Sequence, residues 1–369
     1  MATPQITNDH SVAATLESSR RGVNSVARFS FRFFAALLGL ALLTTLVLRT
    51  GPQTIWNQVH KVGFGLVLVI LLGGLAHLIR TWSWRLIVGY DITAVPWSRS
   101  FAACLVSEAL GQLGVGGKVL GEGMRISLLR SAVPLTNAIP ASAIDGGIHL
   151  VTSLIVMLSG ITVTLLLAPL SGMWRNSALM FAFAVIAVLI LVFVSIVKRW
   201  ALMGNAARAI ARVPRFHNWI ARKLPVIDSS EQNLLDFLHK APARFCAAFL
   251  LNFLWQAITI LEIYIILRFM GTHITVLGAS VMEGLTKLIN LVGAFNPGNV
   301  GTYEGGNMLI TKLFSVAGTV GLTLALCRRA CVLFWASIGA ICLMLMRTPN
   351  EQHRKHDVNS DPSPEIAQL

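Results

Sequence analysis

The sequence predicts an all-α polytopic membrane protein with about six transmembrane helices and two re-entrant helical hairpins. Of its 369 residues, 55% are hydrophobic and only 12% are charged, with a mean hydropathy of +0.69. A water-soluble domain would have about a quarter of its residues charged. Several apolar runs are long enough to cross a bilayer, and two glycine-rich polar stretches, 111–130 and 294–306, interrupt them.

The charge balance favours lipid partners over nucleic acid. The chain carries 30 basic and 16 acidic residues. In a membrane protein such an excess indicates positive cytoplasmic loops and contact with anionic lipids. The polar residues 1–30 have no cleavage site and are expected to form a cytoplasmic tail. The polar residues 347–369 are expected to form a second, disordered cytoplasmic tail.

Six apolar runs are long enough to be spans, and basic residues orient them. Arginines before the first run place the N-terminus in the cytoplasm, and Arg80 is interpreted as the start of a cytoplasmic segment after the second run. The expected spans are residues 31–48, 62–79, 138–167, 177–197, 245–267 and 317–346.

Residues 198–244 form a basic insert that must lie in the cytoplasm, because they contain nine Lys and Arg against three acids. Basic and apolar residues mix in the part from 205 to 224. This part either lies on an anionic leaflet or is a solvated connector that only enforces topology.

Three of the expected spans carry charge inside them. Asp145 lies in the third span, Glu262 in the fifth, and Arg328 and Arg329 in the sixth. Each unpaired charge would cost roughly 2.5 to 3.5 kcal/mol there. Asp145 is therefore either a functional carboxylate or a capped helix end. The two arginines either act within the membrane or mark an aqueous junction in a split helix.

The first glycine-rich stretch, 111–130, is expected to enter and leave the membrane from the cytoplasmic side. Its glycines prevent one straight helix, and such backbone is tolerated at membrane depth only where it lines protein or water. Glu122 and Arg125 lie three residues apart and share a helical face, and Lys118 adds a cation nearby. The alternative is an ordinary cytoplasmic loop with solvated charges.

Residues 276–314, which include the second glycine-rich stretch, are expected to repeat this pattern from the opposite side. Glu283, Lys287 and Asn290 are spaced four and then three residues apart, so they share one helical face. The loop that follows contains Asn296 and Glu304 among glycines whose freed amide groups can bind an anion such as a lipid phosphate.

The order of elements predicts an inverted 3+3 repeat. Two spans, a hairpin and a span occur in residues 31–170 and again in 171–346, and the two copies have opposite orientation. Glu108 and Glu283 begin the similar segments EALGQL and EGLTKL. Many transporters place a substrate site between such repeats.

No motif for cofactor, metal or nucleotide chemistry is present. The sequence around Lys118 differs from a Walker loop, because Gln112 and Val119 stand where that loop needs Gly and Ser or Thr. HExxH, G-x-S-x-G and GxGxxG are absent. We therefore expect no cofactor and no enzymatic activity.

Two motifs resemble the transmembrane domain of lysylphosphatidylglycerol synthases. They are the Gly-Glu-x-x-Arg of 121–125 with its following Leu-Leu-Arg, and the Pro-Gly-x-x-Gly-x-x-Glu of 297–304. Residues 329–335 also resemble a pattern in the family's last span. The chain departs from the family at Gly117 and Lys118, and at Ser142 and Ala143 before the aspartate. Free-standing members of this flippase-like group include one associated with hopanoid biosynthesis.

The resemblance implies a bacterial inner-membrane flippase that moves a polar lipid, such as a hopanoid or an aminoacylated phospholipid. The family's separate aminoacylation domain has no counterpart in this sequence. The alternatives are a membrane-embedded transferase with Glu122 or Glu304 as a base, and a scaffold for lipid-biosynthesis proteins. The residues expected to bind the lipid headgroup are Lys118, Glu122, Arg125, Asp145, Glu283, Lys287, Asn290, Asn296, Glu304, Arg328 and Arg329.

Four of these residues are expected to form one charge-balanced site where the hairpins meet: Glu122, Arg125, Glu304 and Arg329. Mutual pairing would offset the cost of each isolated charge near the middle of the membrane.

Overall fold

A computed structural model describes residues 48, 52–89, 93, 95–111, 117–167, 171–197, 202–212, 220, 224–225, 227–228, 232, 236–237, 240–293, 296 and 299–345. Within these residues the regular elements are helices and no strand occurs. The expected first span, apart from residue 48, lies outside the described residues, as do both tails.

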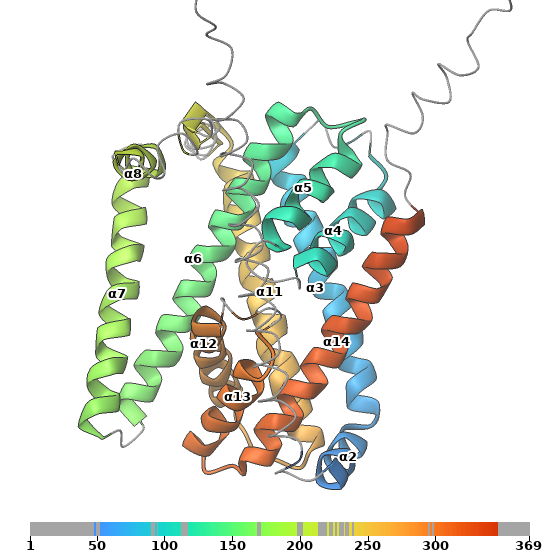
Figure 1. Cartoon of the computed structure of the whole chain (residues 1–369), viewed down its shortest axis with the longest axis vertical. Coiled ribbons are helices and arrows are strands. Elements are labelled where there is room, and N and C mark those ends of the chain that lie inside the picture. The colour runs from blue at the N-terminus through green and yellow to red at the C-terminus, as the bar shows by residue number, and fades with distance from the viewer. Residues whose placement is uncertain are drawn as a thin grey trace, which may run out of the picture.

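Among the described residues, five helices are long and apolar enough to cross a membrane. They run side by side along the long axis of the molecule (Figure 1). They are α3 (Phe64–Val88), α6 (Leu135–Leu167), α7 (Gly172–Val197), α11 (Pro242–Phe269) and α14 (Gly318–Leu345). The all-helical class and five of the expected spans are therefore confirmed.

The helix α3 continues beyond the expected end of its span. The expected boundary at residue 79 followed the drop in hydropathy at Arg80, yet the helix reaches Val88. Trp84, four residues beyond Arg80, is only 1% exposed and packs with Leu128 and Leu129. Arg80 is thus an interior residue of a membrane helix and not the start of a loop.

Two helical hairpins fill the space between the long helices. One comprises α4 (Trp97–Gly111) and α5 (Gly117–Leu129), and the other α12 (Val276–Val292) and α13 (Thr302–Leu313). At 1.5 Å per residue each arm is roughly 18 to 26 Å long, shorter than the hydrocarbon core. The hairpins enter the bundle from opposite ends (Figure 1).

Each hairpin packs against the last long helix of the other half. The arm α12 packs on α6, where Gly160 and Gly284 bring the two backbones together. The arm α4 packs on α14, where Gly339 lies against the carbonyl of Leu105. Glycine is needed at these crossings because a Cβ atom would collide with the facing backbone.

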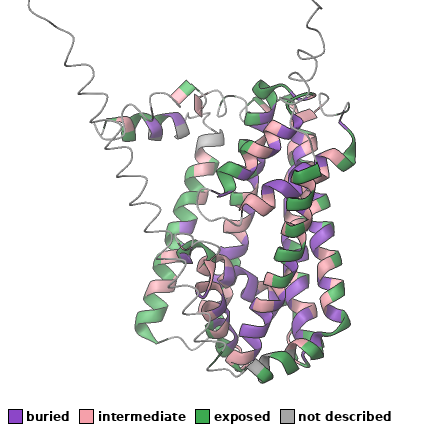
Figure 2. Ribbon diagram, turned by 45° about the vertical axis from the view of Figure 1, so that its right-hand side comes forward, coloured by how far each residue is buried: buried purple, intermediate pink, exposed green. Residues whose placement is uncertain are grey.

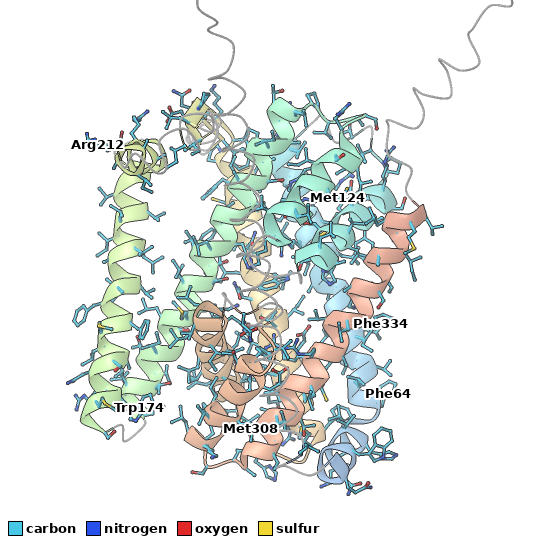
Figure 3. All side chains as sticks on the ribbon, viewed as in Figure 1. Phe64, Met124, Trp174, Arg212, Met308 and Phe334 are labelled. Atoms are coloured by element: carbon cyan, nitrogen blue, oxygen red, sulfur yellow. The ribbon has the colours of Figure 1, made fainter. Side chains whose placement is uncertain are left out.

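The helix α7 lies at the edge of the bundle, against α6, and its surface is largely exposed (Figure 2). Trp174 and Arg212 mark opposite ends of the molecule on this side (Figure 3). Arg212 follows the short helix α8 (Leu202–Ala211), which lies across the end of α7. Another short helix, α2 (Pro52–Val62), lies at the end opposite α8 (Figure 1).

The glycine crossing generates a first prediction. In Gly284→Ala the new Cβ would lie 2.6 Å from the carbonyl oxygen of Val156 and 2.9 Å from the Cα of Gly160. We expect a loss of about 1 to 3 kcal/mol in the free energy of unfolding. The measurement is unfolding of the purified protein in detergent micelles.

Gly146→Ala is the matched control, because a Cβ atom at this α6 position would meet nothing within 4 Å. Its stability should be unchanged or raised by up to about 1 kcal/mol through helix propensity. Equal stability of the two variants would contradict the close crossing of α6 and α12.

Candidate functional site

Two networks of charged side chains lie inside the bundle, one at each hairpin. The first network joins Arg80 of α3, Glu108 of α4, and Glu122 and Arg125 of α5. Arg80 forms an ion pair with Glu108 and lies 4.0 Å from Glu122. Arg125 forms an ion pair with Glu122 at 2.5 Å. The side chains of Arg80, Glu108 and Glu122 are 23 to 29% exposed, so this part of the network is accessible.

Arg125 is enclosed by protein, with an exposure of 1%. Its guanidinium lies 4.8 Å from the ring centroid of Trp84 and donates to the hydroxyl of Ser142 at 3.3 Å. The same hydroxyl accepts a hydrogen bond from the indole of Trp84. Arg125 therefore holds Glu122 in place from behind and does not face an open surface. The cytoplasmic-loop interpretation is excluded for this residue.

Asp145 lies well inside α6 and is 2% exposed, so it is not the cap of a helix end. Its carboxylate accepts a hydrogen bond from Ser83 of α3 at 2.8 Å. Ser83 in turn accepts one from Asn252 of α11 at 3.0 Å. Three long helices thus converge on this carboxylate.

The second network joins α11, α12, α13 and α14. Glu283 accepts from Arg328 at 2.8 Å and pairs with Lys287 at 3.0 Å. Arg328 also lies 3.6 Å from the carboxylate of Glu262. The helix α14 is continuous through Arg328, so the interpretation of a split helix at this point is wrong.

Glu304 links the start of α13 to α14 and is fully buried. One carboxylate oxygen accepts from the guanidinium of Arg329 at 2.6 Å, and the other accepts from the backbone N–H of Gly301 at 2.6 Å. Gly301 precedes the helix with a φ of 79°, a conformation that favours glycine. The carboxylate thus satisfies a helix N-terminal donor and an arginine at once.

An aromatic contact lies between the two networks. The ring of Trp255 packs edge-on against His149 at 4.8 Å, and the ammonium of Lys287 lies 5.3 Å from the Trp255 centroid. His149 also interacts electrostatically with Arg80 and Glu108 of the first network. The expected four-residue site is therefore arranged as two ion pairs, each within its own network, and their joint role stays a prediction.

Three of the expected headgroup residues lie apart from the buried networks. Lys118 is exposed at the start of α5. Asn290 accepts a hydrogen bond from Asn299 at 2.7 Å, and Asn296 donates to the carbonyl of Val300 at 2.6 Å. These two amide side chains hold the connection between α12 and α13 together.

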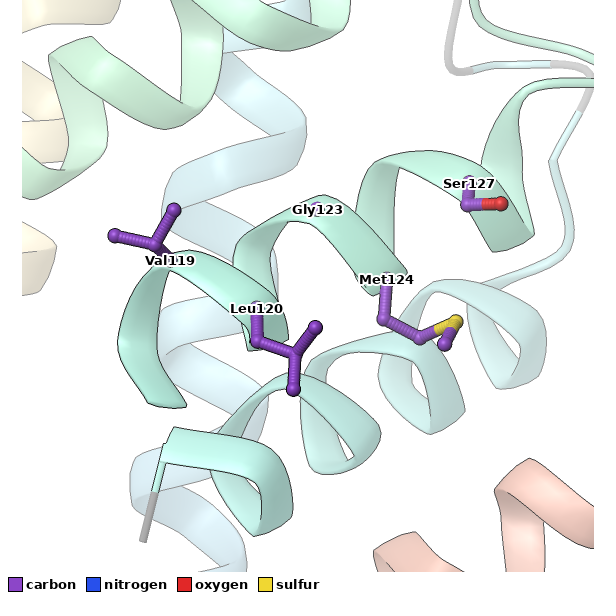
Figure 4. Close-up of a pocket in the computed structure, with 5 residues that line it drawn as sticks. All are labelled: Val119, Leu120, Gly123, Met124 and Ser127. Carbon is purple, nitrogen blue, oxygen red and sulfur yellow. The ribbon is translucent and has the colours of Figure 1, made fainter. Parts of the chain in front are cut away.

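A shallow apolar groove of about 460 Å³ lies on the outward face of α5. It is lined by Val119, Leu120, Gly123, Met124 and Ser127 (Figure 4). Their spacing places all five on one side of the helix, opposite the buried side of Gly121 and Arg125. One helix thus separates an apolar groove from a charged interior.

Residues 32–339 match the family described as lysylphosphatidylglycerol synthase TM region. The chain belongs to this family. No curated protein and no solved structure gives a significant match. The family predicted from the two glycine-rich motifs is thus confirmed, and with it a multi-pass membrane protein.

Several residues of the two charged networks were not predicted from the sequence to belong to the site. Arg80 was assigned to a cytoplasmic segment, and Glu108 was used only to align the two halves. Glu262 was noted as a charge within a span but was not assigned to a site. One signal could have found Arg80: it follows the apolar run directly, so one more turn of helix buries it. Within the described residues, no group of three His, Cys, Asp or Glu could hold a metal ion.

Removal of Arg328 should destabilise the second network strongly. Arg328→Met would leave Glu262 without its basic partner, and breaking a buried pair in this way costs about 3 to 5 kcal/mol. Adding Glu262→Gln to this variant removes the stranded charge and should recover part of the loss. A double-mutant cycle in detergent micelles measures the coupling. Unchanged stability of Arg328→Met, or no recovery in the double variant, would contradict this arrangement.

Proposed function

We propose that the protein moves a polar-headed lipid between the leaflets of a bacterial inner membrane by non-covalent transport. The observation that carries this proposal is the pair of ion-pair networks inside a membrane bundle, each formed by a half-length hairpin and long helices. Charged residues at membrane depth are costly and commonly line the path of a polar substrate.

Exchange of ion-pair partners provides a mechanism. Arg80 can release Glu108 and bind a lipid phosphate, while Glu108 and Glu122 can accept an ammonium or hydroxyl group of the headgroup. Each internal partner lost is replaced by a partner on the lipid, so no charge is left alone during the step. The partial exposure of these three side chains supports this role.

The lipid tails stay in the apolar phase during this exchange. The outward groove of α5 offers an apolar surface on the helix that carries Lys118 and Glu122. A lipid lying against this helix can keep its tails in the groove while its headgroup reaches the charged side.

The packing of the two halves supports the inverted repeat that we propose for this transporter. In such a repeat α4 corresponds to α12, α6 to α14, and α3 to α11. The contact of α4 with α14 then corresponds to the contact of α12 with α6, and the equivalent helices α3 and α11 pack on each other. Hairpins that enter from opposite ends can expose the two networks to opposite sides in turn, as alternating access requires.

The distribution of basic residues supports a cytoplasmic N-terminus and a cytoplasmic α8. The end of the bundle near α8 carries more described basic residues outside the networks than the opposite end. They are Arg85, Arg99, Arg130, Arg208, Arg212, Lys240 and Arg244 at the first end, and Lys61, Arg175, Arg268 and Lys312 at the other. The amphipathic α8 then lies on the cytoplasmic leaflet.

The substrates we propose are an aminoacylated phospholipid, as the family description suggests, or a hopanoid-related lipid. Proteins of lipid biosynthesis are the proposed partners. Because we infer transport without covalent chemistry, lipid should change leaflet without forming a new product.

Glu122→Gln should slow lipid movement while leaving the protein folded. The substitution removes a charged acceptor from the accessible part of the first network, where such a hydrogen bond is worth about 1.5 to 3 kcal/mol, or roughly ten- to hundredfold in rate. The measurement is leaflet exchange of fluorescent phosphatidylglycerol in vesicles that contain the purified protein, with product analysis by chromatography.

Asp236→Asn is the control, because Asp236 is exposed and forms an ion pair with Lys240, which belongs to neither network. Arg125→Ala should instead lower protein abundance, since Arg125 is buried. Normal exchange by Glu122→Gln, or a new lipid product, would refute non-covalent transport through this network.

Single cysteines test the proposed orientation. In a background without the five native cysteines, Cys at Arg175 or Gly271 should react with an impermeant reagent from outside the cell. Cys at Arg212 or Lys240 should react only after permeabilisation. The reverse pattern at either end would overturn the orientation and the membrane sidedness of both hairpins.

A further inference from the structure

Asp145 is a buried carboxylate for which the described residues supply no ion-pair partner. It is 2% exposed, and its one described hydrogen bond comes from the neutral hydroxyl of Ser83. Each other acid that the structure describes inside the bundle lies within 4.0 Å of an arginine or lysine nitrogen. A carboxylate in this position is costly unless it is neutralised.

A charge balance of the two networks leads to the same residue. In the second network Glu262, Glu283 and Glu304 are matched by Lys287, Arg328 and Arg329. Around the first network the three carboxylates of Glu108, Glu122 and Asp145 face the two guanidinium groups of Arg80 and Arg125. Lys118 is exposed, and its described electrostatic interactions are with Glu108 and His149. Of these three carboxylates, Asp145 is the one that no described ion pair within 4.0 Å matches.

We propose that Asp145 binds a proton during the transport cycle and couples lipid movement to a proton gradient. This inference rests on the proposed transport function and specifies its energy source. Protonation removes the excess charge without bringing another side chain into the bundle, and intramembrane carboxylates serve in proton relays in this way.

The surroundings of Asp145 favour a proton over a metal ion. Hard cations require several oxygen ligands, about six or more for Ca²⁺ and Mg²⁺. Among the described residues, Asn252 directs its NH₂ group toward Ser83 and the carbonyl of Ala248, and so does not offer its oxygen at that point. The described oxygens next to the carboxylate are thus too few to surround a metal ion.

Lipid binding can control this protonation through Arg80. Arg80 pairs with Glu108, lies 4.0 Å from Glu122, and stands one turn before Ser83 on α3, whose hydroxyl donates to Asp145. When a lipid phosphate binds Arg80, its negative charge partly offsets the positive charge that Arg80 places on the Asp145 side of α3. Lipid binding then favours proton uptake, and by linkage proton uptake favours lipid binding.

The other charged and titratable groups around Asp145 are consistent with this coupling. From α5, Arg125 reaches Ser142, one turn before Asp145 on α6. His149 lies one turn after Asp145 on the same helix, and Lys287 of α12 acts on His149. The neighbouring α11 contributes uncharged Asn252, which reaches Asp145 through Ser83. Arg80 is therefore the cation through which the lipid acts on Asp145.

The first experiment measures leaflet exchange of fluorescent phosphatidylglycerol in vesicles of phosphatidylethanolamine and phosphatidylglycerol, with and without an imposed pH gradient. The gradient should accelerate exchange by the wild-type protein by about tenfold, within the usual range of coupling. Asp145→Asn should show the same rate with and without the gradient. Asp145→Glu, which retains the carboxyl group, and the exposed control Asp236→Asn should keep the response.

A second measurement does not depend on transport. A pH-indicator dye should report proton uptake when phosphatidylglycerol is added to the wild-type protein in detergent, and Asp145→Asn should abolish this uptake while eluting as a folded protein in size-exclusion chromatography. A wild-type rate that ignores the pH gradient, or follows a sodium gradient instead, overturns the coupling. If the wild-type protein exchanges no lipid at all, the proposed transport is refuted. If the dye reports no proton uptake by the wild-type protein, the proton site itself is refuted.

Discussion

Pairing of carboxylates with guanidinium groups away from bulk water is the interaction on which this bundle depends. A guanidinium or carboxylate that loses its partner inside the bundle costs several kcal/mol, so the helices that carry them must approach in a fixed register. Arg328 shows this constraint, because it faces Glu283 of α12 and Glu262 of α11 together. The position of a hairpin is set as much by its charges as by its apolar surface.

Glycine residues allow the helices to approach closely enough for these ion pairs to form. Gly160, Gly284 and Gly339 let a hairpin arm lie directly against the backbone of a long helix. In a membrane the packing of close backbones replaces much of the driving force that water supplies to a soluble core. The same residue type also ends α12 at Gly293 and precedes α13 at Gly301.

Hydropathy was sufficient to predict much of the fold, because a membrane span can be recognised from about twenty consecutive apolar residues. Five spans and the four hairpin arms followed from this signal and from the glycine-rich breaks. The predicted ends of the spans were less accurate. The helix α3 continues past Arg80, because Glu108 on another helix neutralises the charge of Arg80. Hydropathy counts Arg80 as a charge and cannot include a partner 28 residues away.

Most residues of the candidate site could be predicted from the sequence, but most of the pairings between them could not. Glu122 with Arg125 could be paired from helical spacing alone, since both lie on α5. The pairing of Glu304 with Arg329 depends on how α13 meets α14, which the sequence of neither helix specifies. Asn290 and Asn296 form hydrogen bonds within the connection between α12 and α13, and their expected role in headgroup binding stays a prediction, because an amide can serve both purposes.

The unbroken course of α14 has a mechanical consequence. Gly339 fits against α4 of one hairpin, while Arg328 and Arg329 hold α12 and α13 of the other. These attachment points are about 16 Å apart along a single rod with no proline in it. Because one unbroken helix carries both attachments, a tilt of α14 would displace both hairpins together.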